Sequence, residues 1–269
     1  MQVGWSILLI IHGILAVFLL GAITHQAVGV SWPVTKRSAG FFGAVRGVNG
    51  MSYTNAVIIL FIVTFALGTI IYPTYRVNVR TVLQEYRLFK PEGAFEMKEH
   101  LLALSLALLP VYWYLWRSAS EANRVARAGA DLHHCVCGVV GLPDRSRHQQ
   151  HPGIRIMTKV ERLAAVFGIA FAIIYAPTMD FNWTLATYHP IQGIWQLGRA
   201  PPLGGGSPAM YWYGFIFTSA LAAAAVTALA ALIPDKLMDR VPWRSLTWLV
   251  PLGAIIYIAY VLLPYATKS

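Results

Sequence analysis

Charged side chains are scarce in this chain of 269 residues. Asp, Glu, Lys and Arg together make up 12% of it, about half of the share that soluble domains carry. Hydrophobic residues make up 57%, and the mean hydropathy is +0.56. This composition excludes a soluble globular enzyme and a disordered chain, because neither can carry so much apolar surface. It is typical of a polytopic integral membrane protein.

Cysteine is nearly absent as well. The two cysteines, Cys135 and Cys137, are separated by one residue, a spacing that rarely allows a disulfide, so a disulfide scaffold is excluded. There is neither Lys nor Arg before the first apolar run, whereas a secretory signal peptide begins with a positive segment. We therefore expect the first apolar segment to be a retained transmembrane helix.

Acidic residues are fewer than basic ones, 11 against 21, and the net charge is +10. In a soluble protein such a balance would point to nucleic acid. Here the Lys and Arg residues lie almost wholly between apolar runs, where they set membrane topology and contact anionic lipid headgroups. We therefore expect the lipid bilayer, and no nucleic acid, among the partners.

A helix that crosses a bilayer needs about 20 mostly apolar residues. Six segments meet or approach this length, at about residues 4–26, 52–75, 98–117, 160–179, 210–233 and 245–265. Tyr and Trp gather at several of their ends, as in the interfacial belt of membrane proteins. We predict an all-α integral membrane protein with a single transmembrane domain. Its polytopic bundle has six transmembrane helices, or seven if residues 128–153 form another.

The connections between these segments predict the topology. With six helices, one side of the membrane receives fourteen Lys and Arg residues and the other seven, which places both termini outside. Residues 76–97 predict a short helix on the membrane surface, with Arg76, Arg80 and Arg87 in a solvated basic strip. The alternative is that this strip docks an acidic partner or lipid headgroups. Residues 180–209 predict an ordered interfacial segment followed by a flexible turn at Gly204–Gly206.

One stretch, residues 128–153, differs in character from its surroundings. It reads AGADLHHCVCGVVGLPDRSRHQQHPG and holds four of the eight histidines and both cysteines. Imidazole and thiolate ligands suit zinc or copper, although no standard zinc pattern is matched. The candidate ligands are His133, His134, Cys135, Cys137, His148 and His151. Two other interpretations stay open: a solvated loop, and a frameshifted gene model whose shifted reading would give a further apolar helix.

Histidines in the apolar segments are candidate cofactor ligands, because ionisable residues inside a membrane are costly and often functional. His12 lies about a third of the way along the first segment, and His100 opens the third. If the helices alternate in direction, the two histidines lie on the same side at similar depth. Two such imidazoles can ligate the iron of a b-type haem. We therefore predict His12 and His100 as haem ligands, with hydrogen bonding to a neighbouring helix as the alternative.

His25 and His189 are further candidates for binding a cofactor. His25 closes the first segment, and its spacing from His12 puts the two about 140° apart around the helix. This angle argues against two haems stacked along one helix. His189 precedes a proline in an extended segment and is a candidate ligand or quinone contact at the membrane edge, with a polar loop residue as the alternative.

The acidic residues lie almost entirely outside the apolar segments, which argues against a proton pump with a buried carboxylate relay. No residues form a self-contained catalytic set, so we expect no catalysis by the chain alone. The leading prediction is a membrane subunit of a larger electron-transfer complex, respiratory or photosynthetic, in the bacterial inner membrane. It would bind haem b and exchange electrons with quinone. The alternatives are a cofactor-free structural subunit that anchors partner subunits and, less favoured, a small-solute transporter.

Overall fold

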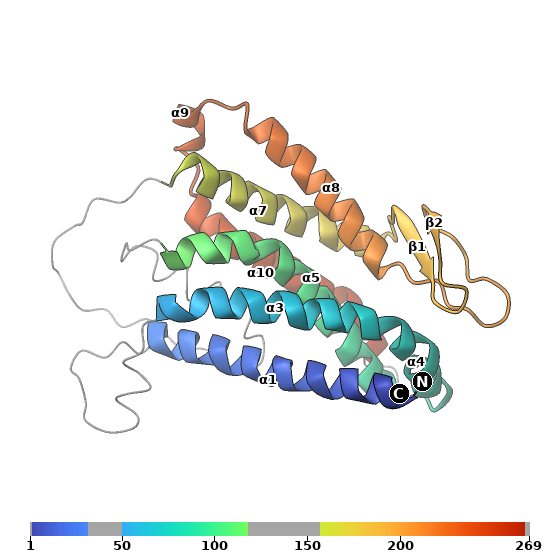
Figure 1. The fold of residues 1–269 in the computed structure, drawn as a ribbon. Coiled ribbons are helices and arrows are strands. Elements are labelled where there is room, and N and C mark those ends of the chain that lie inside the picture. The colour runs from blue at the N-terminus through green and yellow to red at the C-terminus, as the bar shows by residue number, and fades with distance from the viewer. Residues whose placement is uncertain (1, 32–49, 118–156, 267–269) are drawn as a thin grey trace, which may run out of the picture.

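The computed structural model describes residues 2–31, 50–117 and 157–266. Six long helices run through these residues and form one bundle (Figure 1). Their bounds are α1 (Gln2–Ser31), α3 (Gly50–Thr74), α5 (Phe89–Arg117), α7 (Lys159–Asp180), α8 (Trp212–Ala230) and α10 (Trp243–Ala266). Each overlaps one of the predicted segments, so the predicted helical membrane bundle is confirmed.

The predicted number of membrane spans is wrong. Among the described residues, five helices are long and apolar enough to cross a membrane, and α5 is not one of them. Its first turns carry five charged residues, Lys90, Glu92, Glu96, Lys98 and Glu99, which shorten its apolar part. The seventh helix predicted at residues 128–153, with the metal ligands and the frameshift considered there, lies outside the described residues.

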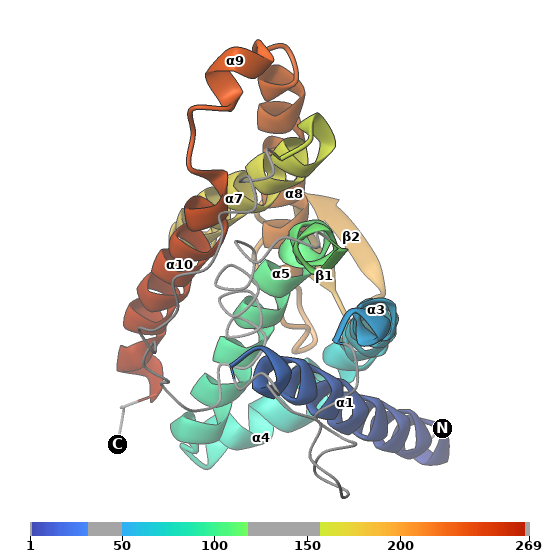
Figure 2. The ribbon, with the colours of Figure 1, turned by 90° about the vertical axis from the view of Figure 1, so that its left-hand side faces the viewer.

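Helix α5 is instead the central helix of the bundle. It contacts α3, α7 and α10, and Figure 2 shows it between them. Leu104 of α5 and Ile258 of α10 belong to one buried cluster. Helices α5 and α7 approach so closely that a Cβ at Gly168 would lie 2.9 Å from a methyl carbon of Leu108. Because α5 faces protein on most sides, it does not need the apolar surface that lipid requires of the other helices.

Helix α1 has the opposite environment. Only 11% of the 18-residue apolar stretch of this helix is buried, and large side chains such as Ile10, Val17 and Phe18 are exposed. It packs mainly on α3. Near its end, the hydroxyl of Tyr112 on α5 donates a hydrogen bond to the buried side chain of Gln26. Its exposed apolar surface is the one expected of a helix at the lipid boundary.

The polar segment after α3 continues that helix. Pro73 lies inside α3, and a π-helical turn, η1 (Tyr75–Val79), and the short helix α4 (Arg80–Glu85) follow without a break. A proline lacks a backbone N–H and crowds the preceding turn, which favours such a widened turn. The chain then reverses at Arg87, whose φ is 56°, and enters α5. The short helix predicted within residues 76–97 is therefore present as α4, but it continues α3, and the residues from Phe89 onward belong to α5.

A hairpin departs from the all-helical prediction. The strands β1 (Ala186–His189) and β2 (Ile194–Leu197) pair antiparallel within the predicted interfacial segment. The predicted glycine turn follows, with Gly205 and Gly206 both at a φ of 77°. Figure 1 shows the hairpin at the end of the bundle where α1 begins and α10 ends.

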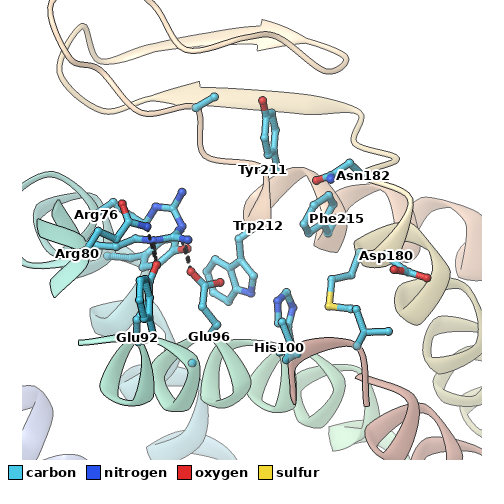
Figure 3. Close-up of a pocket in the computed structure, with 18 residues that line it drawn as sticks. Arg76, Arg80, Glu92, Glu96, His100, Asp180, Asn182, Tyr211, Trp212 and Phe215 are labelled. Carbon is cyan, nitrogen blue, oxygen red and sulfur yellow. Dashed lines mark hydrogen bonds and ion pairs between the residues drawn. The ribbon is translucent and has the colours of Figure 1, made fainter. Parts of the chain in front are cut away.

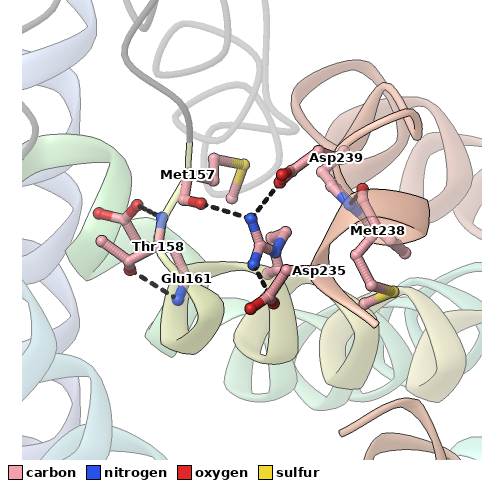
Figure 4. A network of polar contacts seen from close by, with 8 residues as sticks. Met157, Thr158, Glu161, Asp235, Met238 and Asp239 are labelled. Atoms are coloured by element: carbon pink, nitrogen blue, oxygen red, sulfur yellow. Dashed lines mark hydrogen bonds and ion pairs between the residues drawn. The ribbon is translucent and has the colours of Figure 1, made fainter. Parts of the chain in front are cut away.

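The opposite end of the bundle is held by a buried arginine. Arg162 of α7 is 5% exposed and lies 2.5 Å from Asp235 of the short helix α9 (Asp235–Met238), and it also pairs with Asp239 (Figure 4). Helix α7 begins just before it with a capping box, in which Thr158 and Glu161 exchange hydrogen bonds. The ion pairs therefore tie the start of α7 to the connection between α8 and α10.

Candidate functional site

A cavity of about 450 Å³ lies at the hairpin end of the bundle. Helix α5 forms one side of it, and residues of η1, α4, α7, α8 and α10 form the others (Figure 3). One part of its lining is aromatic and apolar, and it includes Met179, Tyr211, Trp212, Phe215, Val261 and Leu262. The other part is polar and comes from the continuation of α3 and from the start of α5. A volume of this size suits a small organic ligand.

The polar part is a group of paired charges that we call the ion-pair cluster: Arg76, Arg80, Glu92 and Glu96. Arg80 lies 2.6 Å from Glu92 and 2.7 Å from Glu96, and Arg76 lies 3.2 Å from Glu96. Gln84 donates a further hydrogen bond of 2.7 Å to Glu92. The predicted solvated strip at Arg76 and Arg80 is therefore wrong. Both arginines are largely buried, and a buried charge must be paired.

Glu96 is the member of this cluster with altered acidity. Burial raises the pKa of Glu96 above its ordinary value, the guanidinium of Arg76 opposes the rise, and the charge of Glu92 adds to it. The loss of water outweighs the ion pair, so Glu96 takes up a proton at a higher pH than an exposed glutamate. This wall of the cavity therefore carries a group that can accept and release a proton.

Aromatic rings connect the cluster to the apolar part. The ring of Tyr72 on α3 meets that of Trp212 on α8 edge-on, with centroids 5.2 Å apart. On α5, Phe95 lies nearly parallel to Tyr72 at 6.3 Å and stacks on Tyr75 at 3.7 Å. The guanidinium of Arg76 lies 5.9 Å from the centroid of the Tyr72 ring. Such contacts hold the rings in fixed orientations, so that the cavity presents a preformed aromatic wall.

His100 is the predicted site residue that lines the cavity. Its side chain is directed from α5 into the cavity beside that of Glu96 (Figure 3), and the residue is 4% exposed. Nδ1 lies 2.8 Å from the hydroxyl of Tyr175 on α7. The other ring nitrogen, Nε2, has no hydrogen-bond partner among the described residues. One nitrogen is thus engaged by the protein, and the other is left for a ligand.

His12 does not line the cavity. Its imidazole packs on Gly68 of α3, where an added Cβ would lie 3.2 Å from Cε1. Its Nδ1 is buried without a hydrogen-bond partner among the described residues. His12 and His100 therefore contact different helices, α3 and α7, and the structure does not bring them together at one site. Haem ligation by this pair stays a prediction.

The other two candidate histidines lie elsewhere. The ring of His25 packs on Tyr53, with centroids 5.1 Å apart. His189 is fully buried in the hairpin, where Nε2 lies 2.9 Å from the side-chain oxygen of Gln196. Among the described residues, no three His, Cys, Asp or Glu side chains form a group that could hold a metal ion.

Sequence reasoning missed the residues that complete the site of His100. Tyr175 is 75 residues away, on a helix whose neighbours are not evident from local spacing. The ion-pair cluster did leave a signal. Arg76 and Arg80 are four residues apart and share a helix face, and the same is true of Glu92 and Glu96. Because the two faces carry opposite charges on adjoining segments, this spacing indicates ion pairs between them.

The chain matches no protein-family model, and no curated protein or solved structure is significantly similar to it. The function of the cavity is therefore argued from its own geometry.

Proposed function

We propose that the chain is a membrane subunit of a larger electron-transfer complex and that it binds the head group of a quinone in the cavity beside His100. The observation that carries this proposal is the placement of the imidazole, which is buried, held at Nδ1 by Tyr175 and directed into the cavity. We place the complex, respiratory or photosynthetic, in the bacterial inner membrane.

The lining suits each part of a quinone. The head group is a flat ring with two carbonyl oxygens, and one of these would meet the unengaged nitrogen of His100. Trp212 and Phe215 offer aromatic surface to the ring. Val261 and Leu262 of α10 line the same cavity, so an apolar tail would leave along this helix, whose length and composition suit a membrane. The ligand would therefore enter from the bilayer.

The ion-pair cluster would serve the protons of the reaction. Reduction of a quinone to a quinol takes up two electrons and two protons. In the proposed role, a redox group of a partner subunit donates or receives the electrons. Glu96, whose pKa is raised by burial, lies on the cavity wall and would donate or receive a proton. The b-type haem predicted for His12 and His100 would use the same imidazole of His100, so it is an alternative to quinone binding there and has its own test.

The proposal is tested by titrating the full chain in lipid nanodiscs with a short-tailed benzoquinone, followed by quenching of tryptophan fluorescence. We expect saturable quenching, and we expect His100→Ala to weaken binding about tenfold, the effect of one well-formed hydrogen bond. His25→Ala is the matched control, because His25 does not line the cavity. Unsaturable quenching, or equal affinity of the wild type and His100→Ala, would contradict the proposal.

A cofactor-free structural subunit is the second candidate, and the exposure of α1 favours it. Only 11% of the apolar stretch of α1 is buried, so this helix offers a long surface to a neighbouring membrane subunit as well as to lipid. This candidate predicts no quinone binding and no haem spectrum from a folded chain. This candidate would be supported if partner subunits co-purify with the wild type and are lost when Val17 and Phe18 of α1 are replaced by polar residues.

A further inference from the structure

The contact between Tyr175 and His100 bears on where the imidazole proton lies. The hydroxyl oxygen of Tyr175 is 2.8 Å from Nδ1 of His100. Either the phenol donates to Nδ1, or Nδ1–H donates to the phenol oxygen. The first arrangement leaves the proton of a neutral imidazole on Nε2, and the second places a proton on Nδ1.

The surroundings of the phenol decide between the two arrangements. Tyr175 is fully buried, so a phenol that accepted from Nδ1–H would need another acceptor for its own O–H. In the part of the chain that the structure describes, the other polar group near the phenol is the indole N–H of Trp212, which can donate but cannot accept. Among the described residues, no hydrogen bond joins the phenol to the carboxylates of Glu96 or Glu99. Nδ1 of His100 is therefore the acceptor for this O–H.

We infer that Tyr175 holds His100 as the neutral tautomer with its proton on Nε2, so that the cavity takes its ligand through an oxygen that accepts a hydrogen bond. Together with the proposed function, on which this last step rests, the inference predicts that the cavity binds the oxidised form of the quinone more tightly than the reduced form. The carbonyl of the oxidised quinone accepts such a bond more strongly than a quinol hydroxyl, whose O–H would itself need an acceptor.

Tyr175 is well placed for this role because it cannot turn away. Its ring stacks on Phe171, with centroids 5.4 Å apart and an interplanar angle of 13°. It lies in the same buried cluster as Leu104 and Ile258, between α5, α7 and α10. Tyr175 does not line the cavity. It is therefore a positioning residue, which acts on the ligand only through His100.

The tautomer is measured without any ligand. Nitrogen NMR of the full chain, labelled with ¹⁵N-histidine, reports which ring nitrogen carries the proton, and the His100 signals are those absent from His100→Gln. We expect a protonated Nε2 and an unprotonated Nδ1 in the wild type, and a mixture of both tautomers in Tyr175→Phe. A proton on Nδ1 in the wild type, or a tautomer unchanged in Tyr175→Phe, would overturn the inference.

The ligand preference is measured with the oxidised and reduced forms of the same short-tailed benzoquinone. We expect the wild type to bind the oxidised form more tightly, and Tyr175→Phe to lower this preference about three- to tenfold. Tyr112→Phe is the matched control. Tyr112 is also buried and hydrogen-bonded, but to Gln26 on the α1 side of α5, away from the cavity. An equal loss of preference in both variants would show a general packing effect and overturn the inference.

The two measurements separate this inference from the proposed function. If NMR gives the expected tautomer but neither quinone form binds, the proposed function and the redox preference fail while the positioning by Tyr175 stands. If quinone binds with the expected dependence on His100 but without a preference between redox forms, the proposed function stands and the inferred preference is overturned.

Discussion

Gly68 of α3 lies against the imidazole of His12 on α1, and a Cβ at Gly68 would come within 3.2 Å of Cε1. The missing side chain is what lets the ring pack onto the α3 backbone. The two helices share one of the larger contacts of the bundle, although α1 is otherwise exposed. This contact makes the placement of α1 sensitive to a single position on its neighbour.

Replacement of Gly68 by Leu should therefore loosen α1. The added side chain must displace the imidazole of His12, and overpacking of this kind costs about 1–3 kcal/mol. Thermal unfolding in detergent, read by circular dichroism, measures the loss. Gly21→Leu on α1 is the control, because nothing lies within 4 Å of a Cβ there. Equal unfolding temperatures for the two variants would contradict the packing argument.

The raised pKa of Glu96 predicts how stability changes with pH. A carboxyl whose pKa is higher in the folded state than in the unfolded state binds its proton more tightly when folded. Its contribution to stability is complete below the unfolded pKa and is lost as the pH rises through the folded pKa. The free energy of unfolding should therefore fall over this range in the wild type, and less steeply in Glu96→Gln. Denaturation in detergent from pH 4 upward, at about one-unit steps, measures how the free energy of unfolding changes with pH in the wild type and in Glu96→Gln. Glu85→Gln, on the exposed face of α4, is the control for the loss of one charge. Parallel slopes for Glu96→Gln and the wild type would refute this account.

The ion pairs of Arg162 predict a non-additive pair of mutations. Asp235 and Asp239 are 59% and 39% exposed at their side chains, whereas that of Arg162 is 6% exposed. Either aspartate alone can still pair the arginine, so Asp235→Asn and Asp239→Asn should each cost at most about 1 kcal/mol. The double variant leaves a buried charge unpaired and should cost about 3 kcal/mol. A double-mutant cycle from unfolding curves measures the coupling, and simple additivity would contradict the shared role of the two aspartates.

The haem prediction is tested by a reduced-minus-oxidised visible spectrum of the purified chain in detergent. Bis-histidine ligation predicts a b-type spectrum that is lost in His12→Ala and in His100→Ala and is kept in His25→Ala. The structure places His12 on Gly68 and His100 beside Tyr175, so binding of haem would also require these contacts to change. A folded chain without a haem spectrum would contradict the haem prediction. The quinone proposal would then be judged by its own titration.

The extent to which the sequence predicts this fold differs between elements. Helix α7 was predicted at residues 160–179 and runs from Lys159 to Asp180, because its apolar run is bounded by charged residues. The start of α5 was predicted nine residues late, at residue 98 instead of Phe89. The apolar run is interrupted in these nine residues by Lys90, Glu92 and Glu96. Glu92 and Glu96 pair with Arg76 and Arg80 on a neighbouring element, and this pairing accommodates their charges in the helix.

The candidate site divides in the same way. His100 was found because a histidine in an apolar run is unusual, and this is a local property of the sequence. Its partner Tyr175 and the aromatic wall at Trp212 could not be found, because both belong to helices that the sequence does not place. His12 was paired with His100 on depth alone, whereas the structure turns it toward Gly68.

The sequence by itself determined that this protein is a helical membrane bundle and, within a few residues, where most of its long helices lie. Both follow from composition and from the length of apolar runs, which set the free energy of transfer from water to lipid residue by residue. Only the tertiary structure decided which helix lies at the centre, which charges are paired and which histidine faces the cavity. These depend on how each helix is turned about its own axis, and packing between segments far apart in the chain sets that rotation.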